Sequence, residues 1–187
     1  MTSRLYSFVG GATGPWQAVS TNVLAGAPIA APSRLDVIDG DISVHPDAQW
    51  ILRGITSNER YVQRTEKDLL AANKPVLGRT SASCAALIPI RKNEAWWSLA
   101  QDERRKLFEE TSKHVTVGLR YIPAIARRLH HCRDLGTNEP FDFLTWFEFA
   151  PADEPAFNDL VAALRASEEW AYVDREIDFR FVRDGSA

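Results

Sequence analysis

The sequence contains little cysteine, and its two cysteines lie far apart. Cys84 and Cys132 form no C-x-x-C pair, which is the spacing that zinc ribbons and thioredoxin-like redox motifs need. The chain also has no Gly-rich phosphate-binding loop and no pattern typical of a Ser-His-Asp triad. These absences exclude several common kinds of site, and we expect both cysteines to be reduced packing residues.

Excess positive charge and long apolar runs are absent as well. The net charge is −3 and no block of Lys or Arg stands out, so nucleic acid is not an expected partner. A Gly-Gly-Ala-Thr-Gly-Pro stretch at 10–15 interrupts the first residues well short of a signal peptide or a membrane span. With 45% apolar and 25% charged residues, the composition predicts a soluble folded protein. We place it in the cytoplasm, with no membrane partner.

The first half of the chain has weak periodicity. Residues 10–32 are rich in Gly, Ala, Pro, Ser and Thr and predict a surface loop or extension. Residues 50–56 predict a short strand. Thr56 and Glu59 then form a capping box, which predicts a helix that runs to about Asn73.

The second half alternates more clearly between strands and helices. Residues 124–132 fit either a helix or a strand. The other elements that we expect are strands at 85–90, 141–149 and 172–183 and helices at 98–118 and 153–170. If 124–132 is a strand, the order is β-α-β-β-α-β, which is the order of a ferredoxin-like α+β unit.

This order predicts an α+β fold made of two related halves. Residues 84–187 form a complete ferredoxin-like half, and residues 1–83 form a truncated copy that carries the extension at 10–32. A sheet shortened in this way leaves strand edges that a second subunit can pair with. We therefore expect a homodimer.

His114 is the first residue that could carry chemistry. In a helix it shares a stripe with Leu107, Thr111 and Gly118, at spacings of three and four. An inward imidazole needs a partner, and two interpretations remain open. Either His114 is a core histidine that donates to a backbone carbonyl, or it is an axial ligand to iron.

Arg127 is the second candidate. In a strand it shares a face with Ile125 and Leu129, whereas Arg128 points the other way and is expected at the surface. A guanidinium on an apolar face is costly unless an anion meets it. That anion is either a carboxylate of the protein or a bound ligand. The histidine pair at 130–131 has no metal-ligand spacing and is expected at the surface.

Glu148 lies among aromatic residues in a predicted strand, so its carboxylate must be paired or protonated. Pairing with Lys92 is the simplest solution. The functional alternative is that Glu148 accepts the second N–H of a metal-bound histidine. Trp96 and Trp97 follow Lys92 closely, and on composition alone they are core or dimer-interface residues.

Together these segments resemble the short, dimeric branch of the chlorite dismutase family. The likeness covers about residues 50–183. The stretches that carry it are WILRGITSNERY at 50–61, AALIPIRK at 85–92, WW at 96–97, YIPAIARRLHH at 121–131 and FDFLTWFEF at 141–149.

The resemblance implies a role for each candidate residue. His114 would be the proximal ligand of a haem iron, and Arg127 would be the distal arginine. Lys92 and Glu148 would support the proximal histidine, and the aromatic pair at 96–97 would lie beside the haem. The fold implied is a dimeric α+β barrel in which each subunit has two ferredoxin-like halves, the first truncated.

The resemblance also implies a cofactor and a reaction. The cofactor is haem b, held without thioether links because the sequence has no C-x-x-C-H motif. The reaction is the decomposition of chlorite to chloride and dioxygen through a ferryl and hypochlorite pair, with Arg127 holding the anion in place. The alternatives are a haem peroxidase and a haem-binding protein without catalytic activity.

Overall fold

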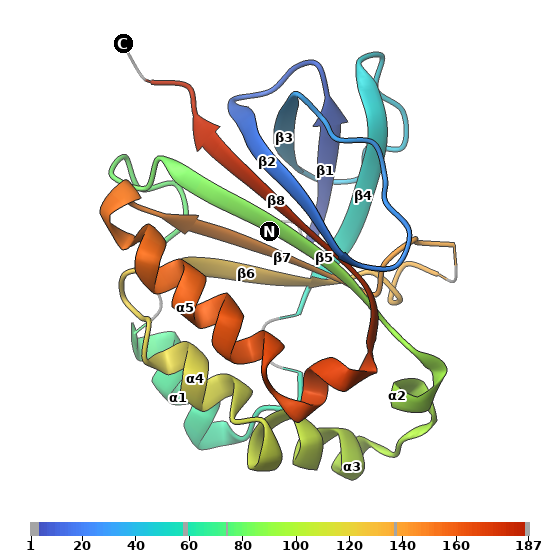
Figure 1. Cartoon of the computed structure of the whole chain (residues 1–187), viewed down its shortest axis with the longest axis vertical. Helices are drawn as coiled ribbons and strands as arrows, with labels where there is room; N and C mark the ends of the chain where they lie inside the picture. The colour runs from blue at the N-terminus through green and yellow to red at the C-terminus, as the bar shows by residue number, and fades with distance from the viewer. Residues whose placement is uncertain (1–3, 58–59, 74, 137, 186–187) are drawn as a thin grey trace.

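The chain folds into a closed barrel of β-strands, and its helices gather on one side of the molecule (Figure 1). A computed structural model describes residues 4–57, 60–73, 75–136 and 138–185. Within these ranges the strands close in the order β1-β3-β2-β8-β5-β7-β6-β4, and each neighbouring pair is antiparallel. Strands and helices combined in this way confirm the predicted α+β class.

The strands are β1 (Leu5–Gly11), β2 (Trp16–Ala25), β3 (Arg34–Asp39), β4 (Ala48–Thr56), β5 (Cys84–Lys92), β6 (Ala126–His131), β7 (Phe143–Phe149) and β8 (Val173–Arg183). The helices are α1 (Arg64–Asn73), α2 (Glu94–Ser98), α3 (Gln101–Arg105), α4 (His114–Leu119) and α5 (Glu154–Arg165). A π-helical turn at Lys106–Thr111 joins α3 to α4, and short 3₁₀ turns occupy Pro151–Asp153 and Glu168–Tyr172.

Alternating side chains explain the strands of the second half. In β7, Phe143 and Phe147 face the helices while Leu144 and Trp146 face the barrel interior, so both faces are buried. The segment for which helix and strand were both open is the strand β6. The second half therefore has the predicted order β-α-β-β-α-β. Also confirmed are the strands predicted at 50–56, 85–90, 141–149 and 172–183.

The prediction of a surface loop or extension at 10–32 is wrong for most of that range. Residues 16–25 form β2, which pairs with β8 along its length, and Trp16 is buried in the barrel. Irregular chain is confined to the segments at 12–15 and 26–33. Small and polar residues have weak strand preference, but pairing with a neighbouring strand overrides a local preference.

The helix predicted after the first strand begins later than expected. Thr56 lies in β4, and Glu59 of the predicted capping box lies outside the described residues. α1 begins at Arg64, where the backbone N–H of Gln63 donates to the Glu66 carboxylate at 2.8 Å. The reciprocal carboxylate contact of a capping box therefore forms seven residues further along the chain than predicted.

The long helix predicted at 98–118 is a series of short pieces. α2, α3, the π-helical turn and α4 follow one another, and Lys113 adopts a left-handed conformation with φ of 55° just before α4. A continuous right-handed helix cannot include such a residue, so the helix restarts at His114. The helix predicted at 153–170 likewise ends at Arg165, and a 3₁₀ turn follows it.

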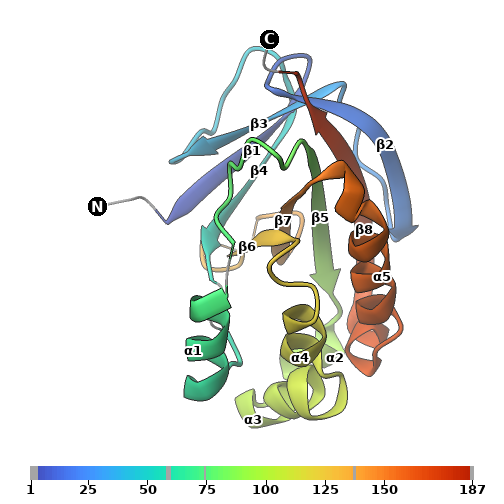
Figure 2. The ribbon, with the colours of Figure 1, turned by 90° about the vertical axis from the view of Figure 1, so that its left-hand side faces the viewer.

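The apolar core has two layers. One lies inside the barrel and includes Phe8, Leu144 and Phe181, and the other lies between the sheet and α5 and includes Phe147 and Phe157. Figure 2 shows α1, α4 and α5 below the barrel, with α1 standing apart from the other two. The second layer continues into the space between these helices and the sheet, and that space holds the candidate site described below.

Several expectations about the surface need correction. His130 and His131 are both buried, because β6 lies inside the sheet between β4 and β7. Arg128 is half-buried, with its guanidinium 3.5 Å from the centroid of the Tyr6 ring. Both cysteines are free. In the part of the chain that the structure describes, no helix is long and apolar enough to cross a membrane.

Candidate functional site

Helices α1, α4 and α5 lie on one side of the sheet (Figure 2). Residues of these helices and of the sheet face that lies toward them line a mainly apolar pocket. The sheet contributes Ile88, Ile90, Lys92, Arg127, Leu129, Phe143, Thr145 and Phe147, and the helices contribute Lys67, Leu70, Ala71, His114, Val115, Val161, Leu164 and Arg165. The structure therefore brings both candidate residues, His114 and Arg127, to the walls of one pocket.

His114 is held by a buried ion-pair network. Its Nδ1 lies 2.8 Å from Oε2 of Glu169, and Nζ of Lys92 lies 2.5 Å from Oε1 of the same carboxylate. The side chains of Lys92 and Glu169 are 2% and 5% exposed, so each charge depends on the other for compensation. Lys92 thus lies beside the carboxylate that supports His114, although its partner is Glu169 and not the predicted Glu148.

The negative charge of Glu169 determines which nitrogen of the His114 ring carries a hydrogen. Burial opposes ionisation, but the charges and hydrogen bonds of His114 and Lys92 outweigh it and lower the pKa of Glu169 to about 2. An ionised carboxylate can only accept hydrogen bonds, so Nδ1 of His114 must donate to it. In a neutral ring Nε2 then has a free lone pair, which is the state that a metal-binding histidine needs.

Local chain geometry explains the direction of the imidazole. The left-handed Lys113 ends the π-helical turn and makes His114 the first residue of α4. Phe108, inside that turn, stacks on the His114 ring with centroids 4.4 Å apart and an angle of 24° between the planes. π-Helical turns are frequent at functional sites because they redirect side chains within a helix.

Arg127 enters the pocket from β6 without a charged partner. Among the described residues, none accepts a hydrogen bond from its guanidinium or forms an ion pair with it. Burial lowers the pKa of Arg127, yet arginine remains protonated in proteins. A Cβ added at Gly118 of α4 would lie 3.4 Å from Nη1 of Arg127, so the guanidinium packs close to that helix. The pocket wall therefore carries a half-buried positive charge that an anion would neutralise.

Thr145 is another polar residue of the pocket wall, and sequence reasoning did not single it out. In the register of β6 and β7, Arg127 faces Phe147 and Leu129 faces Thr145, so Thr145 is a diagonal neighbour of Arg127. Both side chains are half-buried among apolar residues of the pocket wall. Only the pairing register reveals this proximity.

The predicted role of Glu148 beside His114 is wrong. Glu148 lies on the barrel side of β7, where it accepts hydrogen bonds from the backbone N–H of Gly78 at 2.6 Å and from Nε1 of Trp146 at 2.9 Å. The same alternation that turns Phe147 toward the pocket turns Glu148 away from it. The residue that sequence reasoning missed is Glu169, which lies in a 3₁₀ turn and carries no periodic signal.

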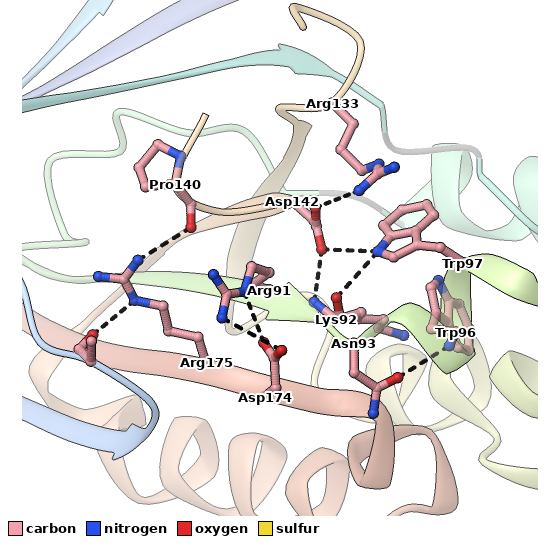
Figure 3. Close-up of polar contacts among 11 residues, drawn as sticks. Arg91, Lys92, Asn93, Trp96, Trp97, Arg133, Pro140, Asp142, Asp174 and Arg175 are labelled. Atoms are coloured by element: carbon pink, nitrogen blue, oxygen red, sulfur yellow. Dashed lines mark hydrogen bonds and ion pairs between the residues drawn. The ribbon is translucent and has the colours of Figure 1, made fainter. Parts of the chain in front are cut away.

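Trp96 and Trp97 lie beside the end of β5 that carries Lys92 (Figure 3), and neither lines the described pocket. Nζ of Lys92 is 3.3 Å from the centroid of the Trp96 ring, a close cation–π contact. Nε1 of Trp97 donates to the Lys92 carbonyl and to Asp142, both at 3.2 Å. The two indoles thus support the strand end that carries Lys92, and their contact with a bound haem stays a prediction.

Asp142 ties this corner of the site together (Figure 3). One carboxylate oxygen accepts the backbone N–H of Lys92 at 2.7 Å and the indole N–H of Trp97, and the other pairs with Arg133 at 3.5 Å. The side chain of Asp142 is buried, and its bonds to Lys92 and Trp97 hold the end of β5 against the start of β7.

Known proteins resemble this chain in sequence and in structure. The family model of chlorite dismutase matches residues 41–184. A chlorite dismutase of Ideonella dechloratans is 32% identical over 133 residues, which are 69% of this chain and 43% of that protein. The chain therefore spans less than half the length of this curated relative.

Two solved structures show the similarity in three dimensions. A dimeric chlorite dismutase from Nitrobacter winogradskyi is 49% identical with a TM-score of 0.89, over 96% of this chain and 99% of that chain. The chlorite dismutase of Candidatus Nitrospira defluvii, in complex with imidazole, is 19% identical with a TM-score of 0.63, over 97% of this chain and 92% of that one. The second likeness concerns the fold alone.

Proposed function

Because the chain belongs to the chlorite dismutase family, we propose that it is an enzyme that uses non-covalently bound haem b to decompose chlorite to chloride and dioxygen. One observation carries the proposal. A single apolar pocket contains a histidine whose Nδ1 donates to a buried carboxylate and an arginine without an anionic partner among the described residues.

The residues of the pocket fit a haem. Its walls are mainly apolar, as a porphyrin requires, and His114 offers a ring nitrogen that its own hydrogen bond to Glu169 leaves free. A bound haem would supply the redox-active iron at which chlorite loses an oxygen atom. The protein contributes the ligand, the charges around it and the exclusion of water.

The proximal side tunes the ligand. Glu169 accepts the Nδ1 hydrogen of His114, which raises the basicity of the ring and stabilises higher oxidation states of a bound metal. Lys92 pairs with the same carboxylate at 2.5 Å and keeps it ionised and oriented. Neither role requires either residue to touch the substrate.

Arg127 binds the anionic substrate and the anion formed from it. The charge of Arg127 attracts chlorite into a pocket of an otherwise acidic chain and holds the chlorine oxyanion that remains after the first oxygen transfer. A held oxyanion reacts again at the site, because retention converts a diffusional encounter into an intramolecular step. Loss of Arg127 would let the oxyanion escape.

The assembly and the location of the protein belong to the same proposal. We propose a homodimer, supported by the 49% identity to a structure described as dimeric. We also propose that residues 1–83 and 84–187 are two ferredoxin-like halves with the first truncated, supported by the order β-α-β-β-α-β of the second. A cytoplasmic location is also part of the proposal.

Haemin titration followed by chlorite addition in an oxygen electrode tests the activity. The wild type should develop a Soret band and release oxygen, and His114→Ala should lose or weaken haem retention. Arg127→Ala should retain haem but release oxygen about 100-fold more slowly, the size expected for loss of one group that stabilises developing charge, and should release more hypochlorite. Arg128→Ala is the matched control, because its guanidinium lies on the other face of β6, against Tyr6.

Each other outcome of this experiment points to a different function. Protein that stays colourless with haemin would refute the proposal. Haem binding with oxidation of a dye by hydrogen peroxide, and no oxygen from chlorite, would indicate a peroxidase. Haem binding without either reaction would indicate a haem-binding protein. An unchanged oxygen yield in Arg127→Ala would contradict the role of that residue alone.

A further inference from the structure

Glu109 is a buried carboxylate that takes no part in the roles proposed above. It lies in the π-helical turn, and the residue is 7% exposed. Its Oε2 accepts the backbone N–H of Val115 at 2.6 Å, and its Oε1 accepts the backbone N–H of Thr116 at 3.2 Å and the Thr116 hydroxyl at 2.6 Å. All three donors belong to the two residues directly after His114.

Helix α4 needs such an acceptor because its own cap position provides none. The first N–H groups of a helix have no partner within the helix, and a side chain at the cap position usually accepts one of them. Here the cap position is Lys113, which is left-handed and forms no side-chain cap hydrogen bond. Glu109, four residues earlier, takes over this function, and its negative charge suits the helix start.

The π-helical turn makes this arrangement possible. It brings Glu109 to the start of α4 and, in the neighbouring position, brings Phe108 onto the His114 ring at 4.4 Å. One turn of chain therefore determines both the backbone that carries His114 and the plane of its imidazole. The hydrogen bond from Nδ1 to Glu169, which lies 55 residues later in the chain, constrains the same ring.

We propose that Glu109 is a positioning residue for the iron ligand: by capping the first turn of α4 it fixes the direction in which the His114 imidazole points. The effect of Glu109 on the orientation of His114 does not require a cofactor, whereas its effect on a bound iron rests on the proposed function. Glu109 acts through backbone N–H groups and does not touch the ligand position itself.

Glu109→Gln and Glu109→Ala test the proposal, with Glu110→Gln as the matched control. Gln keeps the shape and one acceptor oxygen but replaces the other oxygen by an NH₂ group, and Ala removes both acceptors. Glu110 is the next residue, carries the same charge and is exposed. The expected order of effect is Ala, then Gln, with Glu110→Gln indistinguishable from wild type.

The first measurement needs no cofactor. In the full-length chain without haem, amide hydrogen exchange at Val115 and Thr116 should be about tenfold faster in Glu109→Gln and faster still in Glu109→Ala. The NMR resonance of the His114 Nδ1 hydrogen should shift or broaden in the same variants. Unchanged exchange at both amides, or a His114 signal that stays as in wild type while the amides become exposed, would overturn the proposal.

The second measurement uses the haem-loaded protein in its ferrous state. The iron–histidine stretching band in the resonance Raman spectrum should shift or broaden in Glu109→Gln and stay unchanged in Glu110→Gln. A loss of thermal stability without a change in this band would show that Glu109 supports only the fold and would overturn the positioning role. Failure of the wild type to bind haem would refute the proposed function and leave the first measurement valid.

Discussion

Two buried glutamates show how position in the fold determines what a carboxylate does. Glu148 accepts hydrogen bonds from Gly78 and Trp146 inside the barrel, where it holds a loop against the strands. Glu169 lies between Lys92 and His114 at the pocket. Both are buried acids, but only Glu169 faces a residue that can bind a metal, because β7 turns Glu148 to its other face.

The ionisation of Glu169 makes a testable contribution to acid stability. Its pKa is lowered from the ordinary value of 4.5 to about 2 in the folded chain, so folding favours the ionised form. The stabilisation is complete above pH 4.5 and is lost as the pH falls toward 2. A shift of this size corresponds to about 3 kcal/mol in the free energy of unfolding.

Urea unfolding between pH 6 and pH 2.5 measures this contribution. Glu169→Gln should start less stable than wild type, because Lys92 loses its ionic partner, but should lose less stability across the acid window. Glu168→Gln, at the exposed neighbouring residue, should follow the wild-type curve. Parallel curves for wild type and Glu169→Gln would show that the carboxylate does not titrate in this way.

Helix α1 is the least anchored wall of the pocket. Within the described chain it has no buried residue, and Figure 2 shows it separated from α4 and α5. Glu66 joins it to the rest of the molecule through two hydrogen bonds from Arg105, at 2.5 and 2.7 Å, and Arg105 also donates to the Tyr61 carbonyl. The hydrogen bond from Arg105 lowers the pKa of Glu66 below its ordinary value.

Breaking this pair should loosen the helix and the pocket together. Glu66→Gln should speed amide hydrogen exchange in α1 and increase the rate of haem loss to a haem acceptor by several-fold, equivalent to about 1 kcal/mol. Asp68→Asn is the matched control, because Asp68 pairs with Arg64 on the exposed side of the same helix. Exposed pairs of this spacing contribute only about 0.3–0.5 kcal/mol. Equal effects of both variants would show that α1 is not held by Glu66.

The barrel as a whole closes through short seams: among the described residues, β2 with β3 and β4 with β6 each pair over only two residues. β2 pairs with β8 along its length but with β3 only at Trp16 and Gln17. Trp16 lies at the β2–β3 seam, opposite Leu35 of β3. Its ring meets Trp146 of β7 edge to face at 5.2 Å, and the Arg183 guanidinium of β8 lies 4.5 Å from its centroid. One large side chain therefore connects the first strands of the chain to the last.

Replacing Trp16 tests the importance of the seam. Trp16→Ala removes a nearly fully buried indole and should lower the free energy of unfolding by about 3–5 kcal/mol, measured by urea unfolding. Val19→Ala changes an exposed residue of the same strand and should change it by less than about 0.5 kcal/mol. A small effect at Trp16 would mean that the barrel closes without it.

The sequence by itself predicted the strands of the second half and the family, and it singled out His114 and Arg127, which the structure places in the walls of one pocket. Alternation in 141–149 is a local pattern, and local patterns survive folding because each side chain is directed by its own backbone. His114 and Arg127 could be singled out for the same reason, since each lies on an apolar stripe of its own element.

Only the tertiary structure decided which carboxylate supports His114, that residues 16–25 form a strand, and where the helix before His114 breaks. Each of these depends on contacts between residues distant in sequence. Glu169 and His114 are 55 residues apart, and β2 owes its strand conformation to β8 at the other end of the chain. Such contacts are fixed by packing and pairing register, which no local pattern encodes.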